Sequence, residues 1–212
     1  MYRDSNVRIL GEFGTGSASS CGVPWLELEE AASIAKQVMS SRSFGRRVES
    51  LQELNEAISY HAANAAQRLR KQGLFANAVS VFIQNSPFDQ AKFYGRTETV
   101  VLPAPTECSM QVTNAALWLL KKMYQSEVYY QKAGVMLSDL VSEEGQQTDL
   151  FAYSSAHNKS GRLMNAVDQI NSKYRRSTIH LASEGVDRTW AMRRSFKSPN
   201  YAGDWNELPV VS

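Results

Sequence analysis

The sequence contains few of the residues that stabilise a fold covalently or hold a metal ion. Its 212 residues include two cysteines, Cys21 and Cys108, which are too few and too far apart to form a disulfide framework. The three histidines stand singly, without the paired spacing of a metal site, at His61, His157 and His180. We therefore expect a reducing, cytoplasmic environment and neither a metal nor another cofactor.

Long apolar runs and catalytic groupings are also absent. No run approaches the ~20 apolar residues of a membrane helix, and Met1–Leu10 is too polar for a signal peptide, so we expect no membrane partner. The sequence has no Gly-rich phosphate loop and no Ser-His-Asp grouping. The acidic pairs Glu29–Glu30 and Glu143–Glu144 lie in polar segments, which do not hold two metal ions rigidly. The chain as given is expected to be non-catalytic.

Composition divides the chain into four parts. Gly11–Gly22 is rich in Gly and Ser, so residues 1–25 are interpreted as a linker and the end of a missing preceding domain. Residues 26–143 form one module, and residues 144–158 form a polar linker. Over residues 159–212 Lys and Arg outnumber Asp and Glu by nine to five, although the whole chain has a net charge of only +2. This indicates a small basic C-terminal domain, and any nucleic-acid interface must depend on local clusters.

Six segments of the module have the periodicity of helices or strands. Ser50–Gln72 and Ser109–Gln125 carry apolar residues at steps of three and four, which predicts two amphipathic helices. Strands are predicted over Lys36–Val48, Phe75–Gln84, Thr97–Leu102 and Lys132–Val141. This order predicts an α+β fold, a split βαββαβ arrangement with a four-stranded antiparallel sheet and two helices on one face. The other face of the sheet would be free.

The C-terminal segment is predicted to form a helix followed by a hairpin. Ser160–Arg175 has helical spacing, and Ser177–Ala182 can pair with Thr189–Arg194 across the intervening turn. A segment of roughly 50 residues buries little surface alone. We therefore expect it to pack on the module or on a partner.

The first predicted strand carries an unusual number of polar residues: Ser41, Arg42, Ser43, Gly45, Arg46 and Arg47. One interpretation is a sheet edge with solvated arginines. The other is a surface that follows a phosphate backbone, with hydroxyl and guanidinium groups as donors. In the second interpretation Gly45 allows another backbone to approach closely.

Gln147–Phe151 has the form of a linear docking motif. Leu150 and Phe151 are adjacent, so a regular helix or strand cannot turn both toward one core. An extended peptide can insert both into a partner's pocket, with Gln147 hydrogen-bonding at its rim. The alternative is that Leu150 and Phe151 pin a linker to the surface of the module.

Several stretches, in this order, resemble the C-terminal part of the UmuC-like catalytic subunits of bacterial DNA polymerase V, which are Y-family translesion polymerases. The stretches are Ser41–Gly45, Tyr130–Leu137, Asp149–Phe151, Gly161–Met164, Leu181–Gly185, Trp190–Arg194 and Ser198–Tyr201. The resemblance runs from about Leu26 to the end. The family's palm, fingers and thumb, which hold its catalytic carboxylates, have no counterpart here, so the resemblance also implies a non-catalytic region.

The resemblance implies a little finger domain over residues 26–143, whose sheet lies in the DNA major groove. The implied DNA-binding residues are Ser41, Arg42, Ser43, Gly45, Arg46, Arg47, Arg96, Gln131 and Lys132. The implied sliding-clamp motif uses Gln147, Asp149, Leu150 and Phe151, with Thr148 where the family has Leu. The implied role is SOS DNA-damage tolerance at the nucleoid of the cytoplasm.

Two other hypotheses stay open. The chain could be a protein-interaction module that binds a UmuD′-like dimer without touching DNA. It could also be a small enzyme on a ferredoxin-like fold, although no cluster of titratable residues supports a reaction. The salt dependence of duplex binding distinguishes the first alternative from DNA binding, because phosphate contacts weaken steeply with salt.

Overall fold

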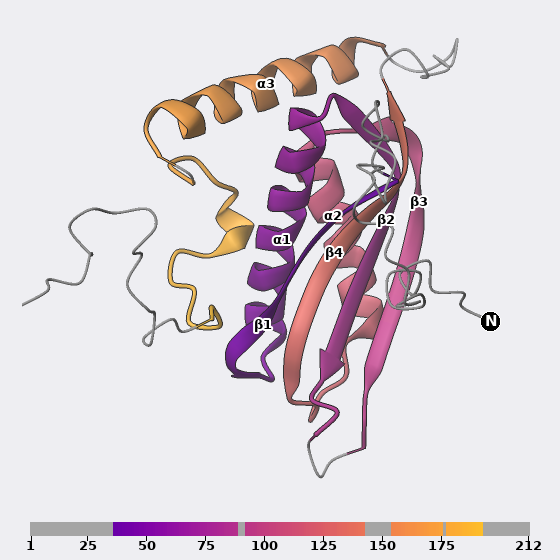
Figure 1. Cartoon of the computed structure of the whole chain (residues 1–212), viewed down its shortest axis with the longest axis vertical. Coiled ribbons are helices and arrows are strands. Elements are labelled where there is room, and N and C mark those ends of the chain that lie inside the picture. Colours follow the sequence, from indigo (N-terminus) through magenta and orange to yellow (C-terminus); the bar gives the residue numbers. More distant parts are fainter. Residues whose placement is uncertain (1–35, 89–91, 143–153, 176, 193–212) are drawn as a thin grey trace, which may run out of the picture. The chain divides into compact units, whose positions relative to one another are not determined.

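The computed structural model describes residues 36–88, 92–142, 154–175 and 177–192, all in the second of the two units into which the chain divides, Ala35–Ser212. The elements of this unit follow one another along the chain (Figure 1). They are β1 (Gln37–Val48), α1 (Leu51–Lys71), β2 (Leu74–Asn85), β3 (Gly95–Thr106), α2 (Ser109–Met123), β4 (Tyr130–Ser142), α3 (Ser154–Lys173) and the 3₁₀ helix η3 (Ala182–Glu184).

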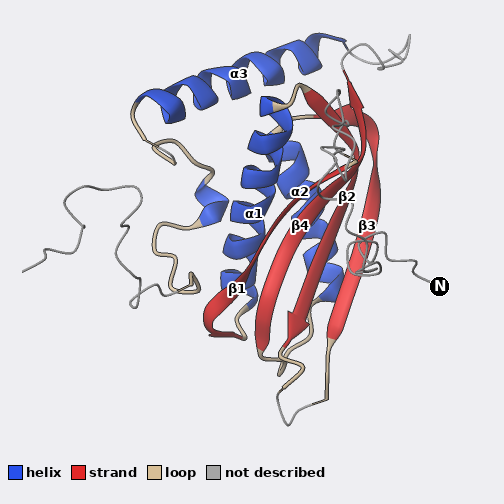
Figure 2. Ribbon diagram, viewed as in Figure 1, coloured by secondary structure: helices blue, strands red, loops and turns tan. Residues whose placement is uncertain are grey.

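The four strands form one antiparallel sheet in the order β1-β4-β2-β3. Helices α1 and α2 lie on the same side of this sheet, and no described helix covers its other side (Figure 2). The predicted split βαββαβ fold is therefore confirmed. β1 and β3 are the edge strands, so each has one row of backbone groups without a strand neighbour in this sheet.

A serine cap and a glycine set the two ends of helix α1. The hydroxyl of Ser50 accepts a hydrogen bond from the Gln52 amide at 3.2 Å and so caps the N-terminus. Gly73 follows the last turn with a φ of +64°, a conformation that glycine adopts without steric cost. Between them the apolar stripe of α1 is completely buried at Leu54, Ile58, Ala62, Ala65 and Leu69.

The core fills the space between the two helices and the sheet. Val79 and Ile83 of β2 and Leu137 of β4 meet the buried stripe of α1 and the Leu119 side of α2. Burial of each such side chain contributes roughly 1.5–3 kcal/mol. This packing fixes which face of each strand is turned inward, and so which face is left for other contacts.

The C-terminal segment differs from the sequence prediction in one respect. Helix α3 is present, but no strand forms within residues 177–192, so the predicted hairpin of Ser177–Ala182 with Thr189–Arg194 is wrong over the described residues. Instead the chain makes the 3₁₀ turn η3, and the carbonyl of Trp190 accepts a hydrogen bond from the Gly45 amide at 3.1 Å. The segment therefore contacts β1 and α1 and does not form a hairpin of its own.

Candidate nucleic-acid interface

Strand β1 separates its side chains cleanly between two faces. Val38, Phe44 and Val48 are buried on the helix side. The hydroxyl of Ser40 shares a 3.1 Å hydrogen bond with Nδ1 of His61 on α1. Successive strand side chains point to opposite faces, so the even-numbered residues of β1 face the helices and the odd-numbered residues face away from them.

This alternation divides the polar residues that the sequence singled out. The pairing places Ser41 and Ser43 on the open face and Arg42 on the helix side. Beyond Ser43 the pairing is irregular, and the alternation between buried Phe44 and Val48 assigns Gly45 and Arg47 to the open face and Arg46 to the helix side. In agreement, the guanidinium of Arg46 forms an ion pair with Glu53 in the first turn of α1. The row of six candidate residues is therefore two groups on opposite sides of one strand.

The strand register fixes the direction of Arg42. Arg42 pairs with Ala133, which is completely buried, so Arg42 lies on the helix side of β1. The pKa of His61 on α1 is lowered from 6.5 to about 4, mainly by burial and in part by the positive charges of Arg42 and Arg68. His61 is thus a neutral core residue, and Arg42 lies at the border between β1 and α1.

The strand register extends the open face across the whole sheet, because directly paired residues share a face. The open-face residues, read from β1 through β4 and β2 to β3, are the rows Ser43, Lys132, Gln84, Gly95; Ser41, Gly134, Phe82, Thr97; Met39, Met136, Ser80, Thr99; and Gln37, Ser138, Ala78, Val101. All of these side chains except Lys132 are uncharged.

Side-chain contacts agree with this assignment. The ammonium group of Lys132 lies 5.8 Å from the ring centroid of Phe82. A Cβ added to Gly134 would lie 2.4 Å from the Cβ of Ser41 and 2.6 Å from the ring of Phe82. Only glycine fits at position 134, because Ser41 and the Phe82 ring occupy the space that a Cβ would need.

The charge of the open face is positive. None of the paired positions named above carries a carboxylate, and Lys132 is the charged residue among them. Lys132 pairs with Ser43, which precedes Gly45 and Arg47 on the same face of β1. Lys132 and the Ser43 hydroxyl therefore lie side by side at one end of the sheet, with Arg47 exposed four residues further along β1, and an anionic backbone can approach this end without electrostatic repulsion.

The remaining sequence candidates lie elsewhere. Arg96 pairs with Ile83, which is buried in the core, so Arg96 lies on the helix side of edge strand β3. Gln131 is exposed next to Lys132, in the part of β4 where the register is irregular. The clamp-motif residues lie outside the described residues: Gln147, Asp149, Leu150 and Phe151.

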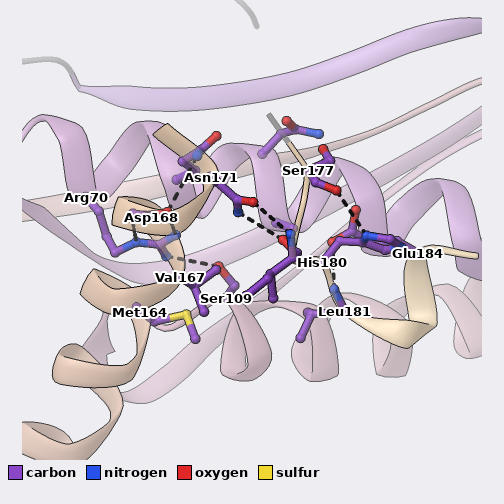
Figure 3. Close-up of a pocket in the computed structure, with 14 residues that line it drawn as sticks. Arg70, Ser109, Met164, Val167, Asp168, Asn171, Ser177, His180, Leu181 and Glu184 are labelled. Carbon is purple, nitrogen blue, oxygen red and sulfur yellow. Dashed lines mark hydrogen bonds and ion pairs between the residues drawn. The ribbon is translucent and has the colours of Figure 1, made fainter. Parts of the chain in front are cut away.

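The helix side of the module is partly occupied by the C-terminal segment, which sequence reasoning did not place (Figure 3). The buried guanidinium of Arg70 donates to both oxygens of Asp168 on α3, at 2.6 and 3.0 Å. Its remaining donor reaches the Glu107 carbonyl at 2.8 Å and the Ser109 hydroxyl at 2.9 Å. Arg70 thus joins α1, α3 and the start of α2 at one point.

A cavity of about 100 Å³ lies beside this ion pair, between α1, α3 and the loop that leads to η3. Glu184 lines it, and burial raises the pKa of its carboxyl although the Leu181 amide and Arg188 act in the opposite direction. These partners satisfy the Glu184 carboxylate, at 3.2 Å from the Leu181 amide and 3.3 Å from Arg188. The cavity therefore lies at the contact between the C-terminal segment and α1, and the Glu184 carboxylate that lines it is already bonded within the η3 turn.

The described residues contain no other chemistry that points to a different class of site. Within them no group of three or more His, Cys, Asp or Glu side chains could hold a metal ion. No helix in the same residues is long and apolar enough to cross a membrane.

The fold and the face together define an α+β domain with one sheet surface that no described helix covers and that carries one lysine among its paired positions. The chain belongs to the impB/mucB/samB family: residues 35–150 match the C-terminal domain of that family. Residues 161–211 match a domain of unknown function (DUF4113). The tail that packs on the helix side of the module is therefore a domain that recurs in other proteins.

Several relatives support this assignment. Protein UmuC of Salmonella typhimurium is 37% identical over 188 residues, covering 88% of this chain and 44% of that protein. Protein MucB of the same species is 35% identical over 192 residues, covering 90% and 45%. A DNA polymerase IV of Desulfatibacillum aliphaticivorans is 26% identical over 159 residues, covering 74% and 39%. The resemblance to UmuC inferred from the motifs is confirmed, and the chain spans less than half the length of these relatives.

A solved complex of a beta-clamp processivity factor with the little finger domain of PolIV also aligns with the chain. It has 15% identity and a TM-score of 0.40, covering 54% of this chain and 98% of that one.

Proposed function

We propose that this chain is the DNA-binding and clamp-tethering region of a UmuC-like translesion polymerase acting in SOS DNA-damage tolerance, and that it is itself non-catalytic. The observation that carries the DNA-binding part is the open sheet face, which has no carboxylate among its paired positions and collects hydroxyls, Lys132 and Arg47 at one end. A surface of this kind contacts the sugar-phosphate backbone without reading sequence. Such binding suits a protein that must move past any base.

The hydroxyl groups of the open face lie on its two edge strands. Ser41 and Ser43 belong to β1 and Thr97 to β3, whereas the ring of Phe82 and the Cβ of Ser41 occupy the space above Gly134. Hydroxyl donors can therefore reach a duplex backbone from both edges of the face. Of the residues first considered, the open-face set is Ser41, Ser43, Gly45, Arg47 and Lys132.

Fluorescence anisotropy with a labelled primer–template hairpin tests this proposal. The slope of log K against log salt is about −0.9 for each phosphate neutralised. Lys132→Ala should weaken binding and reduce the magnitude of that slope by about 1. Lys121→Ala is the matched control, since it removes the same charge from an exposed position on α2, away from the open face. Equal effects of the two substitutions would remove the support for this face.

The clamp-tethering part of the proposal rests on the sequence of Gln147–Phe151. Two large apolar side chains anchor a small interface, and tethering raises the local concentration of the DNA-binding face at the primer end without any stronger grip on DNA. Leu150→Ala with Phe151→Ala should abolish binding to a purified sliding clamp and leave hairpin affinity unchanged. Clamp titration that shows no loss for the double substitution would contradict the assignment.

A second candidate function is supported by the part of the face farthest from Lys132. There Met39 is 49% exposed and Val101 is 72% exposed, and the rows that contain them carry no charge. Exposed apolar side chains of this kind suit a protein partner, such as a UmuD′-like dimer. Val101→Asp should then weaken binding of that dimer, while a salt-independent or undetectable hairpin affinity would favour this function over DNA binding.

A further inference from the structure

The end of β1 lacks the regular support that a sheet normally gives a strand. Pairing between β1 and β4 is continuous from Gln37 to Ser43 and then shifts before Val48. The intervening residues include Gly45 and Arg47, which belong to the candidate DNA-binding face. Their positions therefore depend on contacts from outside the ladder.

The C-terminal domain supplies a backbone contact at this point. β1 is an edge strand, and the Gly45 amide donates to the carbonyl of Trp190 at 3.1 Å. This bond occupies a donor at the irregular end of the strand. It ties a residue of the domain of unknown function to a residue of the open face.

The side chain of Trp190 anchors that bond in the core. The indole is only 3% exposed, and its ring centroid lies 6.1 Å from that of Phe44, 5.7 Å from Tyr60 and 6.2 Å from His61. Phe44 belongs to β1, whereas Tyr60 and His61 belong to α1. Trp190 thus fills the space between the end of β1 and the first helix.

Thr189 adds a polar tie on the same side of the strand. Its hydroxyl donates to the Glu53 carboxylate at 2.8 Å, and Arg46 donates to that carboxylate and, at 3.3 Å, to the Thr189 hydroxyl. Arg46 is therefore held against α1 by its neighbours. It lies on the opposite side of β1 from Arg47.

The preceding residues fasten Trp190 and Thr189 to α1. The guanidinium of Arg188 lies 4.2 Å from the ring centroid of Tyr60 and also bonds to buried Glu184. Gly185 adopts a φ of +69°, and a Cβ there would lie 2.7 Å from the Glu56 carboxylate. Residues Glu184–Trp190, named here the C-terminal strap, therefore follow a close-fitting path along α1.

We propose that the C-terminal strap holds the irregular end of β1 from the helix side, so that Gly45 and Arg47 are presented in fixed positions to DNA on the open face. Trp190 is then a positioning residue that acts through β1 and does not touch DNA. The inference rests on the proposed DNA-binding function and gives the domain of unknown function a role in it. Without the strap, β1 must become ordered again each time DNA binds, which lowers affinity.

Trp190→Ala in the full chain tests the proposal, with Trp118→Ala as the matched control because Trp118 is 58% exposed on α2. We expect the Gly45 amide to exchange faster and hairpin binding to weaken about tenfold in Trp190→Ala, and neither to change in Trp118→Ala. Arg47→Ala should cost less affinity in the Trp190→Ala background than in the wild type, because Arg47 is already misplaced there. A purely structural tryptophan would give additive losses.

The outcomes separate the two proposals. If the wild-type chain does not bind the hairpin, the proposed function fails and the inference falls with it. If the wild type binds and Trp190→Ala binds equally or more tightly while Gly45 exchanges faster, the inference alone is overturned.

A milder substitution covers the case in which Trp190→Ala does not fold. Thr189→Val removes one hydroxyl from an exposed residue and should weaken hairpin binding about threefold. Thr178→Val is its control, because the hydroxyl of Thr178 bonds within the tail to the Arg175 carbonyl. Equal affinity of the two valine variants would overturn the inference.

Discussion

Asp168→Ala should release the C-terminal domain from the module without unfolding the sheet. Asp168 neutralises Arg70, whose side chain is only 6% exposed, through hydrogen bonds of 2.6 and 3.0 Å. Removing one partner of a fully buried ion pair costs about 3–5 kcal/mol, because the other charge stays buried and unpaired. Asp168 itself is 24% exposed, so water replaces part of the lost interaction and we expect about 2–3 kcal/mol.

Hydrogen exchange measures this loss where it occurs. A tail weakened by that amount opens roughly 30 to 150 times more often, so the amides of α3 should exchange faster by that factor while those of β2 and β4 do not change. Asp187→Ala is the control, since Asp187 is an exposed carboxylate of the same tail. Exchange of α3 that is no faster in Asp168→Ala than in Asp187→Ala would refute the view that this ion pair holds the tail.

Two further predictions concern stability. The pKa of His61 is lowered from 6.5 to about 4 in the folded protein, so the unfolded chain takes up this proton at higher pH than the folded one. Protonation should therefore lower the free energy of unfolding by about 3 kcal/mol as the pH falls from 6.5 to 4. Urea unfolding across that range should show this loss in the wild type and not in His61→Phe, and parallel curves for the two proteins would contradict the prediction. Gly134→Ala should destabilise by about 1–3 kcal/mol, because the new Cβ would overlap Ser41 and Phe82, whereas Gly161→Ala in α3 meets only Glu107 at 3.4 Å and should be neutral or stabilising. Equal urea midpoints for the two alanine variants would show that the sheet relaxes around Gly134.

The periodicity of the sequence was sufficient to predict every strand and helix of the module, but not the length of β3. The predicted strand stopped at Leu102 because Pro103 and Pro105 follow, and proline cannot donate to a ladder. In the structure β3 continues to Thr106. Pro103 and Pro105 lie where the register with β2 shifts, between the Ala78–Val101 and Ala76–Thr106 pairs, so their missing amides break no bond of this ladder. Strand order is a long-range property that local sequence does not carry.

The division of the arginines could have been predicted. Val38, Phe44 and Val48 are the apolar residues of β1 at even-numbered positions, and Arg42 and Arg46 share that parity. The sequence prediction grouped Ser41, Arg42, Ser43, Gly45, Arg46 and Arg47 by their polarity alone. It did not apply the two-residue alternation of a strand, and so it joined side chains that lie on opposite faces of β1.

The position of the tail could not be predicted in the same way. Arg70 and Asp168 are separated by 98 residues, and nothing in either local sequence marks them as partners. Trp190 is the one aromatic residue between Tyr174 and Phe196, and a single large aromatic is a weak signal that a segment is anchored. Its neighbours Phe44 and Tyr60 come from distant parts of the chain, so only the tertiary structure identifies the pocket that it fills.

The C-terminal strap contacts β1 as well as α1, and the contact at β1 allows the strap and the open face to influence each other. Phe44 and Arg46 contact the C-terminal strap from one side of the strand, while Ser43, Gly45 and Arg47 belong to the other side. Only the backbone of β1 separates the two sets of side chains, so a change in the strap can reach the open face through β1 itself. Binding at one side must then alter affinity at the other by the same free energy, since coupling between two sites is reciprocal. DNA binding should therefore slow exchange at the Gly45 amide by the factor by which the intact strap tightens DNA binding.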